Sequence, residues 1–210
     1  MDILNLYFID LKYIRDLSNA DENVASQSPQ IGKNNRVYIG VVLLINGQKY
    51  CIPLSSGTKS KYQHGKSEVD MIKIPDERKN ENGSFITLSV LNINNMIPVY
   101  ADVMTRVEIK IRKDDQPTAK ARKELMQKEL SWCRKNSDLI KRRVQKVYNL
   151  ITLTPEKNRN LTRRCCNFKK LEEVMFCYIE KHRSKEKITE HRPMKKPPMT
   201  EPPKSGRGRR

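Results

Sequence analysis

The sequence has few of the residues that mark metalloenzymes, membrane proteins and exported proteins. It contains 3 histidines and 6% aromatic residues in 210 positions, and the histidines, His64, His182 and His191, lie far apart. No apolar run approaches the roughly 18 residues that a membrane-spanning helix needs. The Met1-Asp2 start is acidic and lacks the basic flank of a signal peptide. We therefore expect a cytoplasmic protein without a membrane segment.

Cysteine is also sparse, and its spacing argues against two further kinds of site. The 5 cysteines show no Cys-x-x-Cys spacing; they are Cys51, Cys133, Cys165, Cys166 and Cys177. A disulfide framework needs pairs, and a zinc site needs closely spaced thiol and imidazole ligands. We expect reduced cysteines that fill space in the core, no metal ion and no cofactor.

Positive charge is what the chain has in excess. Lys and Arg number 42 against 24 Asp and Glu, which gives a formal net charge of +18 and a pI near 9.8. Residues 193–210 hold +5 of this charge, so the rest of the chain keeps +13. Solubility does not require an excess of this size, whereas the neutralisation of phosphates does. The charge predicts a polyanionic partner, nucleic acid first and an anionic membrane surface second.

Hydrophobic patterning predicts a sheet in the first half of the chain. The apolar run 38–45 and the strand-like run 49–52 flank Asn46-Gly47. An Asn-Gly pair between apolar runs is the strongest short signal for a β-hairpin, because both turn positions favour positive φ. Other strands are expected at 6–9, 69–72, 85–91 and, from alternation, 97–111. Together these runs predict a curled antiparallel sheet or a small barrel.

The second half of the chain is patterned mainly for helices. Helices are expected at 11–17, from just after Pro117-Thr118, from Asn136 or Ser137 to Tyr148, and from about Phe168 to Tyr178. From Ser184 onward Pro, Lys and Arg dominate and no apolar period remains. The sequence therefore predicts an α+β fold in one domain, residues 1–183, followed by a basic, Pro-rich, disordered tail, residues 184–210.

The loop after the hairpin carries groups that suit RNA cleavage without a metal ion. Such cleavage removes the 2′-hydroxyl proton, stabilises charge on the phosphate and protonates the leaving 5′-oxygen. Residues 53–66 supply hydroxyl, ammonium and imidazole groups, on Ser55, Ser56, Thr58, Lys59, Tyr62 and His64. Many surface loops have the same composition. Taken alone, the cluster does not distinguish a nuclease from a solvated loop.

Short motifs occur in a fixed order along the chain. Tyr-Ile-Gly-Val-Val at 38–42, Ile-Asn-Gly-Gln-Lys-Tyr at 45–50 and Pro-Leu-Ser-Ser at 53–56 are the central ones. The flanking pieces are Lys-Tyr-Ile at 12–14, Asn-Asn-Met-Ile-Pro-Val at 94–99, Asn-Ser-Asp at 136–138, Cys-Asn-Phe at 166–168 and Leu-Glu-Glu at 171–173. Each piece is unspecific. The ordered set, over residues 3 to about 180, resembles the ToxN/AbiQ family of type III toxin endoribonucleases.

This resemblance implies a fold, an activity and a partner. The fold would be a curled antiparallel sheet of the MazF/Kid toxin type with added helices. The activity would be metal-independent cleavage of cellular mRNA that leaves a 2′,3′-cyclic phosphate. The partner would be an antitoxin RNA of repeated pseudoknots, which the toxin processes and which then inhibits it in a protein–RNA assembly. Such toxins are bacterial and often serve in phage defence.

The resemblance also implies site residues. Ser56 matches the serine on which the family depends, and Ser55 holds the preceding hydroxyl position. The family usually continues Ser-Pro-Lys, whereas this chain reads Ser56-Gly57-Thr58-Lys59. We expect Gly57 to absorb the insertion at positive φ, so that Lys59 takes the lysine position, with Lys61 or Thr58 as the alternatives.

The remaining candidates are divided between catalysis and RNA binding. Tyr13 aligns with an active-site tyrosine, although a tyrosine on an apolar helical stripe is more often a core residue. The residues expected to bind RNA are Lys33, Arg36, Lys61, Tyr62, His64, Lys66, Asn94 and Asn167. The asparagines are equally suited to turns and helix caps. A non-catalytic RNA-binding module is the alternative function, and a duplex-DNA binder is weaker because no helix-turn-helix or zinc spacing is present.

Overall fold

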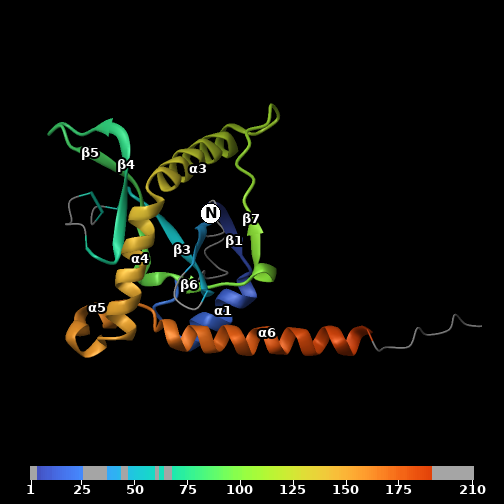
Figure 1. The fold of residues 1–210 in the computed structure, drawn as a ribbon. Coiled ribbons are helices and arrows are strands. Elements are labelled where there is room, and N and C mark those ends of the chain that lie inside the picture. Colours follow the sequence, from blue (N-terminus) through green and yellow to red (C-terminus); the bar gives the residue numbers. More distant parts are fainter. Residues whose placement is uncertain (1–3, 26–36, 44–46, 60–61, 64–67, 191–210) are drawn as a thin grey trace, which may run out of the picture.

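The computed structural model describes residues 4–25, 37–43, 47–59, 62–63 and 68–190. Within these ranges it describes only the backbone at 37–39, at 41–43 and after Arg183. Seven antiparallel strands form the sheet, in the order β4-β5-β3-β2-β1-β7, with β6 paired to β3 (Figure 1). The strands are β1 (Leu6–Ile9), β2 (Val37–Leu43), β3 (Lys49–Ser56), β4 (Met71–Lys79), β5 (Phe85–Asn92), β6 (Ile97–Pro98) and β7 (Met104–Arg106).

This architecture confirms an α+β fold with an antiparallel sheet. The small barrel was wrong, because β4 and β7 lie at opposite ends of the strand order and do not pair with each other. The strand expected over 97–111 is also largely wrong. Pro98 has no N–H to give to a ladder, and a 3-10 turn at Ala101–Val103 separates the short strands β6 and β7.

The predicted hairpin is confirmed as β2 paired with β3. The ladder runs from Tyr38 opposite Pro53 to Leu43 opposite Lys49. Gly47 has φ +72° with nothing within 4 Å of an added Cβ, as a turn glycine should, while Asn46 lies outside the described residues. A register shift at Gly40 marks a bulge, where an added Cβ would meet the backbone of Asn5. Glycine lets β1 and β2 approach each other there.

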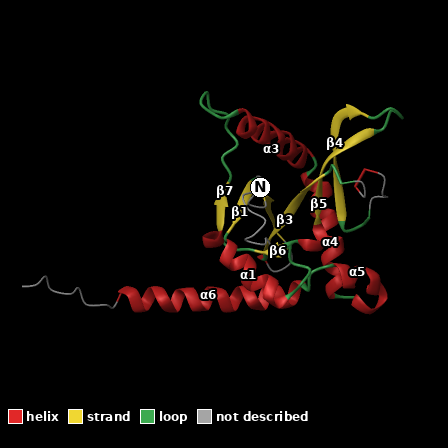
Figure 2. Cartoon of the chain, turned by 180° about the vertical axis from the view of Figure 1, so that it is seen from behind, coloured by secondary structure: helices red, strands yellow, loops and turns green. Residues whose placement is uncertain are grey.

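Helices lie around the sheet (Figures 1 and 2). They are α1 (Leu11–Ala20), α3 (Pro117–Lys135), α4 (Ser137–Thr152), α5 (Arg159–Arg164) and α6 (Phe168–Glu190). Asp10 caps α1, since its carboxylate accepts from the Tyr13 amide at 2.8 Å. The backbone of α6 continues to Glu190, past the expected end of the ordered domain at Arg183. No helix in the described part of the chain is long and apolar enough to cross a membrane.

The core lies between the first half of β3 and helices α1, α4 and α6. Tyr13, Tyr50 and Phe168 are its largest fully buried side chains. The hydroxyl of Tyr50 donates to Glu172 at 2.8 Å, and Tyr148 donates to the same carboxylate at 2.9 Å. Polar atoms in this region are therefore paired, as burial requires. β3 runs from this aromatic core to its polar end at Ser55 and Ser56.

Candidate active site

The candidate site begins where β3 ends. Ser55 lies opposite Val90 of β5, and Ser56 lies opposite Ser89. Successive side chains of a strand point to opposite faces of the sheet, so the two serines face different surroundings. Ser56 is exposed and Ser55 is half-buried.

The Ser55 side of the sheet is a closed polar network. The side-chain amide of Asn92 donates to Ser55 Oγ at 2.8 Å, and Asn92 Oδ1 accepts from the Tyr62 hydroxyl at 3.4 Å. Asn92 is 7% exposed and Tyr62 6%. Ser55 therefore anchors the strand end rather than offering a free hydroxyl, and the tyrosine expected to bind RNA packs into the core instead. The RNA-contact prediction for Tyr62 does not fit this conformation.

The Ser56 side is open. Ser56 Oγ and Thr58 Oγ1 share a hydrogen bond of 2.9 Å, and the Thr58 amide points at Ser56 Oγ from 3.3 Å. Both residues are exposed, and so is Lys59. Two hydroxyls and an ammonium-bearing side chain thus lie within four consecutive residues on the surface. Lys61, His64 and Lys66 lie outside the described residues.

Gly57 is the residue that lets this loop leave the strand. Its N–H donates to the Leu88 carbonyl at 3.0 Å, and an added Cβ would stand 2.1 Å from the Thr87 carbonyl oxygen. The only described glycines with positive φ are Gly47 and Gly83. The expected positive φ was therefore wrong, and close backbone approach is the reason that glycine occupies position 57.

A second clamp holds the loop against β5. The Gln63 side-chain amide donates to the carbonyls of Gly57 at 2.6 Å and Thr87 at 3.0 Å, while its oxygen accepts from the Thr87 amide at 3.2 Å. The Lys59 carbonyl accepts from the Tyr62 amide at 2.8 Å. Because the backbone on both sides of Thr58 is fixed, the positions of Ser56 and Thr58 are largely set in advance, as a reactive site requires.

Tyr13 lies away from this loop, in the core. It is 0% exposed, its hydroxyl donates to the Pro98 carbonyl at 2.8 Å, and its ring packs edge-on against Tyr178 and Tyr100. Burial raises its pKa far above the ordinary value. The catalytic role expected for Tyr13 does not fit this geometry, since no face of the ring is open to a substrate.

The two asparagines expected to bind RNA make structural contacts. Asn94 donates its side-chain amide to the Arg164 carbonyl at 3.1 Å, and its own carbonyl accepts from the Cys166 amide at 2.8 Å. Asn167 is the N-cap of α6, because its side chain accepts from the Lys170 amide at 3.1 Å. The alternative interpretation, turn former and helix cap, fits both residues.

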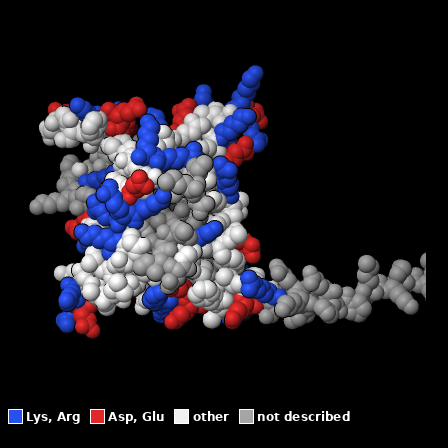
Figure 3. All heavy atoms as spheres, in the orientation of Figure 1, with Lys and Arg blue, Asp and Glu red and all other residues white. Residues whose placement is uncertain are grey.

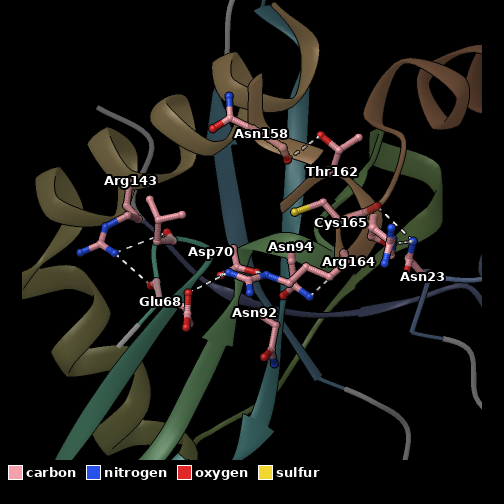
Figure 4. Close-up of polar contacts among 12 residues, drawn as sticks. Asn23, Glu68, Asp70, Asn92, Asn94, Arg143, Asn158, Thr162, Arg164 and Cys165 are labelled. Carbon is pink, nitrogen blue, oxygen red and sulfur yellow. Dashed lines mark hydrogen bonds and ion pairs between the residues drawn. The ribbon is translucent and has the colours of Figure 1, made fainter. Parts of the chain in front are cut away.

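A network around Arg164 fixes the return of the loop into β4 (Figure 4). The Arg164 guanidinium binds both oxygens of Asp70 at 2.8 and 2.9 Å and reaches Glu68 at 2.9 Å. Arg143 donates to the Glu68 carbonyl at 3.1 Å. The segment from Gly57 to Asp70 is thus anchored at both ends, although its middle lies outside the described residues.

Basic side chains gather over α3 and α4 on the face of the molecule that Figure 3 draws. Lys33 and Arg36 lie outside the described residues. The described residues contain no cluster of three or more His, Cys, Asp or Glu side chains arranged to hold a metal ion. Four of the five cysteines are buried, as expected for packing residues, and burial raises the pKa of Cys165 to about 12.

Comparison with known proteins assigns the family. The sequence model described as "Toxin ToxN, type III toxin-antitoxin system" matches residues 5–176. This chain belongs to the ToxN family. Endoribonuclease ToxN of Bacillus thuringiensis subsp. kurstaki is 30% identical over 182 residues, which cover 85% of this chain and 86% of that protein.

Solved structures agree with this family assignment. One comes from a type III toxin–antitoxin system in which a non-coding RNA pseudoknot selectively inhibits the toxin. It is 28% identical with a TM-score of 0.68, and the match covers 85% of this chain and 99% of the solved chain. Another is AbiQ, a lactococcal anti-phage endoribonuclease of a type III system, with a TM-score of 0.67, 26% identity and the same coverage.

Three residues of the candidate site were not identified from the sequence. Asn92, Gln63 and Ser89 come from a buried strand and a loop, and no local pattern sets them apart. Ser89 and Asn92 belong to β5, and the pairing of β5 with β3 brings them to the end of β3, where Asn92 bonds Ser55. Gln63 is held there by its side-chain bond to Thr87 of β5. Covariation with positions 55–57 is the signal that would find them.

Proposed function

We propose that this ToxN-family chain is the toxin of a type III system and cuts RNA by a metal-independent transesterification that leaves a 2′,3′-cyclic phosphate. The observation that carries the proposal is the exposed Ser56–Thr58 hydroxyl pair beside Lys59, on backbone fixed by Gly57 and Gln63. These are the groups that stabilisation of a phosphorane needs. The family name and the endoribonuclease relative support the reaction class.

Each group has a role in this mechanism. The Ser56 hydroxyl contacts the RNA 2′-hydroxyl at the attacking oxygen, and Thr58 donates to a non-bridging phosphate oxygen. The Lys59 ammonium stabilises the extra negative charge of the pentavalent phosphate and protonates the leaving 5′-oxygen. Ser55 keeps the strand end in place through Asn92. Tyr13 takes no part, because its hydroxyl is bound in the core.

The second proposed ligand is an antitoxin RNA of repeated pseudoknots, which the toxin cuts and which then inhibits it. The structural relative inhibited by an RNA pseudoknot supports this, as does the net charge of +18. Lys33, Arg36, Lys61, His64 and Lys66 are retained as proposed RNA contacts. The setting of this activity would be the bacterial cytoplasm. Residues 184–210 lie beyond the family match, which ends at residue 176, and we expect cleavage not to need them.

Ser56→Ala tests the proposal. The variant should lose toxicity and cleave RNA at least about 10²-fold more slowly, because the hydroxyl that contacts the attacking 2′-oxygen is lost, while it still binds the antitoxin RNA. Ser84→Ala, an exposed serine in the β4–β5 turn, is the matched control and should cut normally. Cleavage is measured on purified protein with 3′-end analysis of the products, with and without EDTA.

The outcomes separate the candidate functions. Unimpaired cleavage by Ser56→Ala would remove that serine from the mechanism. Inhibition by EDTA, or a 3′-hydroxyl end, would contradict the metal-independent reaction. A wild-type protein that binds RNA without cutting it would establish the non-catalytic RNA-binding module instead.

A further inference from the structure

A buried carboxylate lies next to the proposed catalytic serine, on the same face of the sheet. Ser56 of β3 is the register partner of Ser89 of β5, and Ser89 is in turn the partner of Ile74 of β4. Register partners project from the same face of an antiparallel sheet, with Cβ atoms about 4.5–5.5 Å apart. Ser89 therefore lies in the middle of a row of three side chains, directly beside Ser56.

Helix α3 covers the middle of this row with Glu129. The Ser89 hydroxyl donates a short hydrogen bond to the Glu129 carboxylate. Ser89 is 1% exposed and Glu129 6% exposed, whereas Ser56 at the end of the row is open to solvent. Ser89 thus lies between a buried carboxyl group, to which its hydroxyl donates, and the surface serine, which is its register neighbour.

Glu129 has an unusual environment for a buried acid. Burial raises its pKa, and the Ser89 hydrogen bond lowers it by less. The sheet presents to it the Ser89 hydroxyl, flanked by apolar Ile74 and by Ser56, none of which titrates near neutral pH. On its own helix, burial raises the pKa of the Cys133 thiol, and the charge of Glu129 adds to that rise. No salt bridge to Glu129 occurs among the described residues.

A buried carboxylate that only a hydroxyl stabilises costs folding free energy. Sites with this property are often functional, because a carboxyl group whose pKa is moved toward neutrality is a more effective proton acceptor than an ordinary surface acid. A serine hydroxyl without a base is, in contrast, a poor proton acceptor. The ToxN-type chemistry at Ser56 needs such a base, and the described loop offers hydroxyls and a lysine.

We propose that Glu129, acting through Ser89, is the positioning residue that lets Ser56 accept the 2′-hydroxyl proton of the RNA. The Ser89 proton is committed to Glu129, so the Ser89 oxygen is free to accept from Ser56 once Ser56 rotates away from Thr58. The lone pairs of Ser56 then face the substrate. This inference rests on the proposed ribonuclease function and names the base for it.

The proton transfers balance. The 2′-oxygen passes its proton to Ser56 as the 2′-O–P bond forms, Ser56 passes its own proton to Ser89, and Ser89 passes its proton to the Glu129 carboxylate. The P–O5′ bond breaks and Lys59 protonates the 5′-oxygen. After product release, protons return from Glu129 through the two hydroxyls to water, and Lys59 regains a proton from water.

Glu129→Gln is the decisive variant, since it keeps the shape and an oxygen that accepts from Ser89 but cannot take a proton. RNA cleavage should fall at least about 10²-fold, with binding of antitoxin RNA unchanged. The wild-type profile of kcat/KM against pH should rise as Glu129 loses its proton, and this acidic limb should disappear in Glu129→Gln. Glu124→Gln, an exposed acid on the same helix, is the matched control and should keep both rate and limb.

Stability separates this role from a structural one. A structural carboxylate should lower the melting temperature when it is replaced, whereas Glu129→Gln should melt no lower than wild type at pH 7. If Glu129→Gln does not fold, Ser89→Ala is tested instead. It interrupts the proposed proton path between Ser56 and Glu129, so the acidic limb of its kcat/KM profile should also disappear.

Two results would overturn the inference while leaving the ribonuclease intact. The first is wild-type cleavage by a folded Glu129→Gln with an unchanged pH profile. The second is a Ser89→Ala protein that cuts normally. A wild-type protein that cuts no RNA would contradict the proposed function instead, so the two failures remain distinct.

Discussion

The two ends of the segment that carries the candidate site are stabilised in opposite ways. At the return into β4, the buried Asp70, 1% exposed, forms a two-pronged ion pair with Arg164. At the departure from β3, the buried Glu129, 6% exposed, has one hydroxyl partner, Ser89. Both are carboxylates taken out of water, and only one is neutralised by a cation.

This difference shows what each end does. A buried charge that is fully paired is costly to break, and its pairing fixes the geometry of the chain. A buried carboxyl group supported by a hydroxyl stays ready to exchange a proton. The return end is therefore an anchor, and the departure end, where Ser56, Thr58 and Lys59 gather, is where we propose that the chemistry takes place.

The largest expected effect comes from breaking the anchor. Arg164→Met leaves Asp70 buried without its cation and should lower the free energy of unfolding by about 2–3 kcal/mol. That is below the roughly 3–5 kcal/mol typical of a broken buried pair, because the Arg164 side chain is 43% exposed and water can reach part of the site. Urea unfolding at pH 7 measures it. Arg163→Met, at the exposed neighbouring position, is the control, and equal losses in the two variants would contradict the anchor.

A somewhat smaller effect is expected where the loop leaves β3. Gly57→Ala sets a methyl group 2.1 Å from the Thr87 carbonyl oxygen, so the loop must shift, at a cost of about 1–3 kcal/mol. Cleavage should fall as well, because Ser56 and Thr58 move with the backbone. Gly83→Ala is the control: its Cβ meets nothing within 4 Å, and it should lose some stability from positive φ but no activity. Full activity in Gly57→Ala would show that this close approach does not position the site.

The smallest effect, and the one of opposite sign, comes from neutralising Glu129. A carboxyl group whose pKa is raised on folding binds its proton more tightly in the folded state. Below the ordinary pKa of Glu, the group is protonated in both the folded and the unfolded state and does not lower the free energy of unfolding. As the pH rises from there through the raised pKa of the folded state, that free energy falls. Glu129→Gln should match wild type at low pH and be more stable at pH 7, by less than either change above. Melting temperatures from pH 4 to 8 measure the difference, and a constant gap would contradict the assignment.

Part of this molecule follows from local sequence. Asn46-Gly47 between an apolar and a strand-like run predicted the β2–β3 hairpin, and the helix expected just after Pro117-Thr118 is α3, which begins at Pro117. The ordered motifs identified the family, which the match over residues 5–176 confirms. Ser56 and Thr58 were also identified from the sequence, because the chemistry of an exposed hydroxyl follows from the residue type alone. Their catalytic roles remain predictions.

Other features could not be predicted locally. The helical spacing of apolar residues around Tyr13 does not reveal whether its ring faces a ligand or the core. The ring is buried by its contact with Tyr178 and by the hydrogen bond from its hydroxyl to the Pro98 carbonyl. Gly57 was expected to turn at positive φ, but the Thr87 carbonyl, thirty residues away, is what requires glycine there. The small barrel expected from the strand pattern did not form, because β4 and β7 do not pair.

The sequence by itself determined the α+β class, the excess of positive charge, the family and the polar end of β3, because composition, periodicity and motif order are local properties of the chain. The tertiary structure alone decided which buried polar groups have partners. Register brought Ser89 beside Ser56, α3 brought Glu129 onto Ser89, and α5 brought Arg164 to Asp70. Burial and the distance between charges depend on residues remote in sequence, and these set whether a carboxylate anchors the fold or stays available for proton transfer.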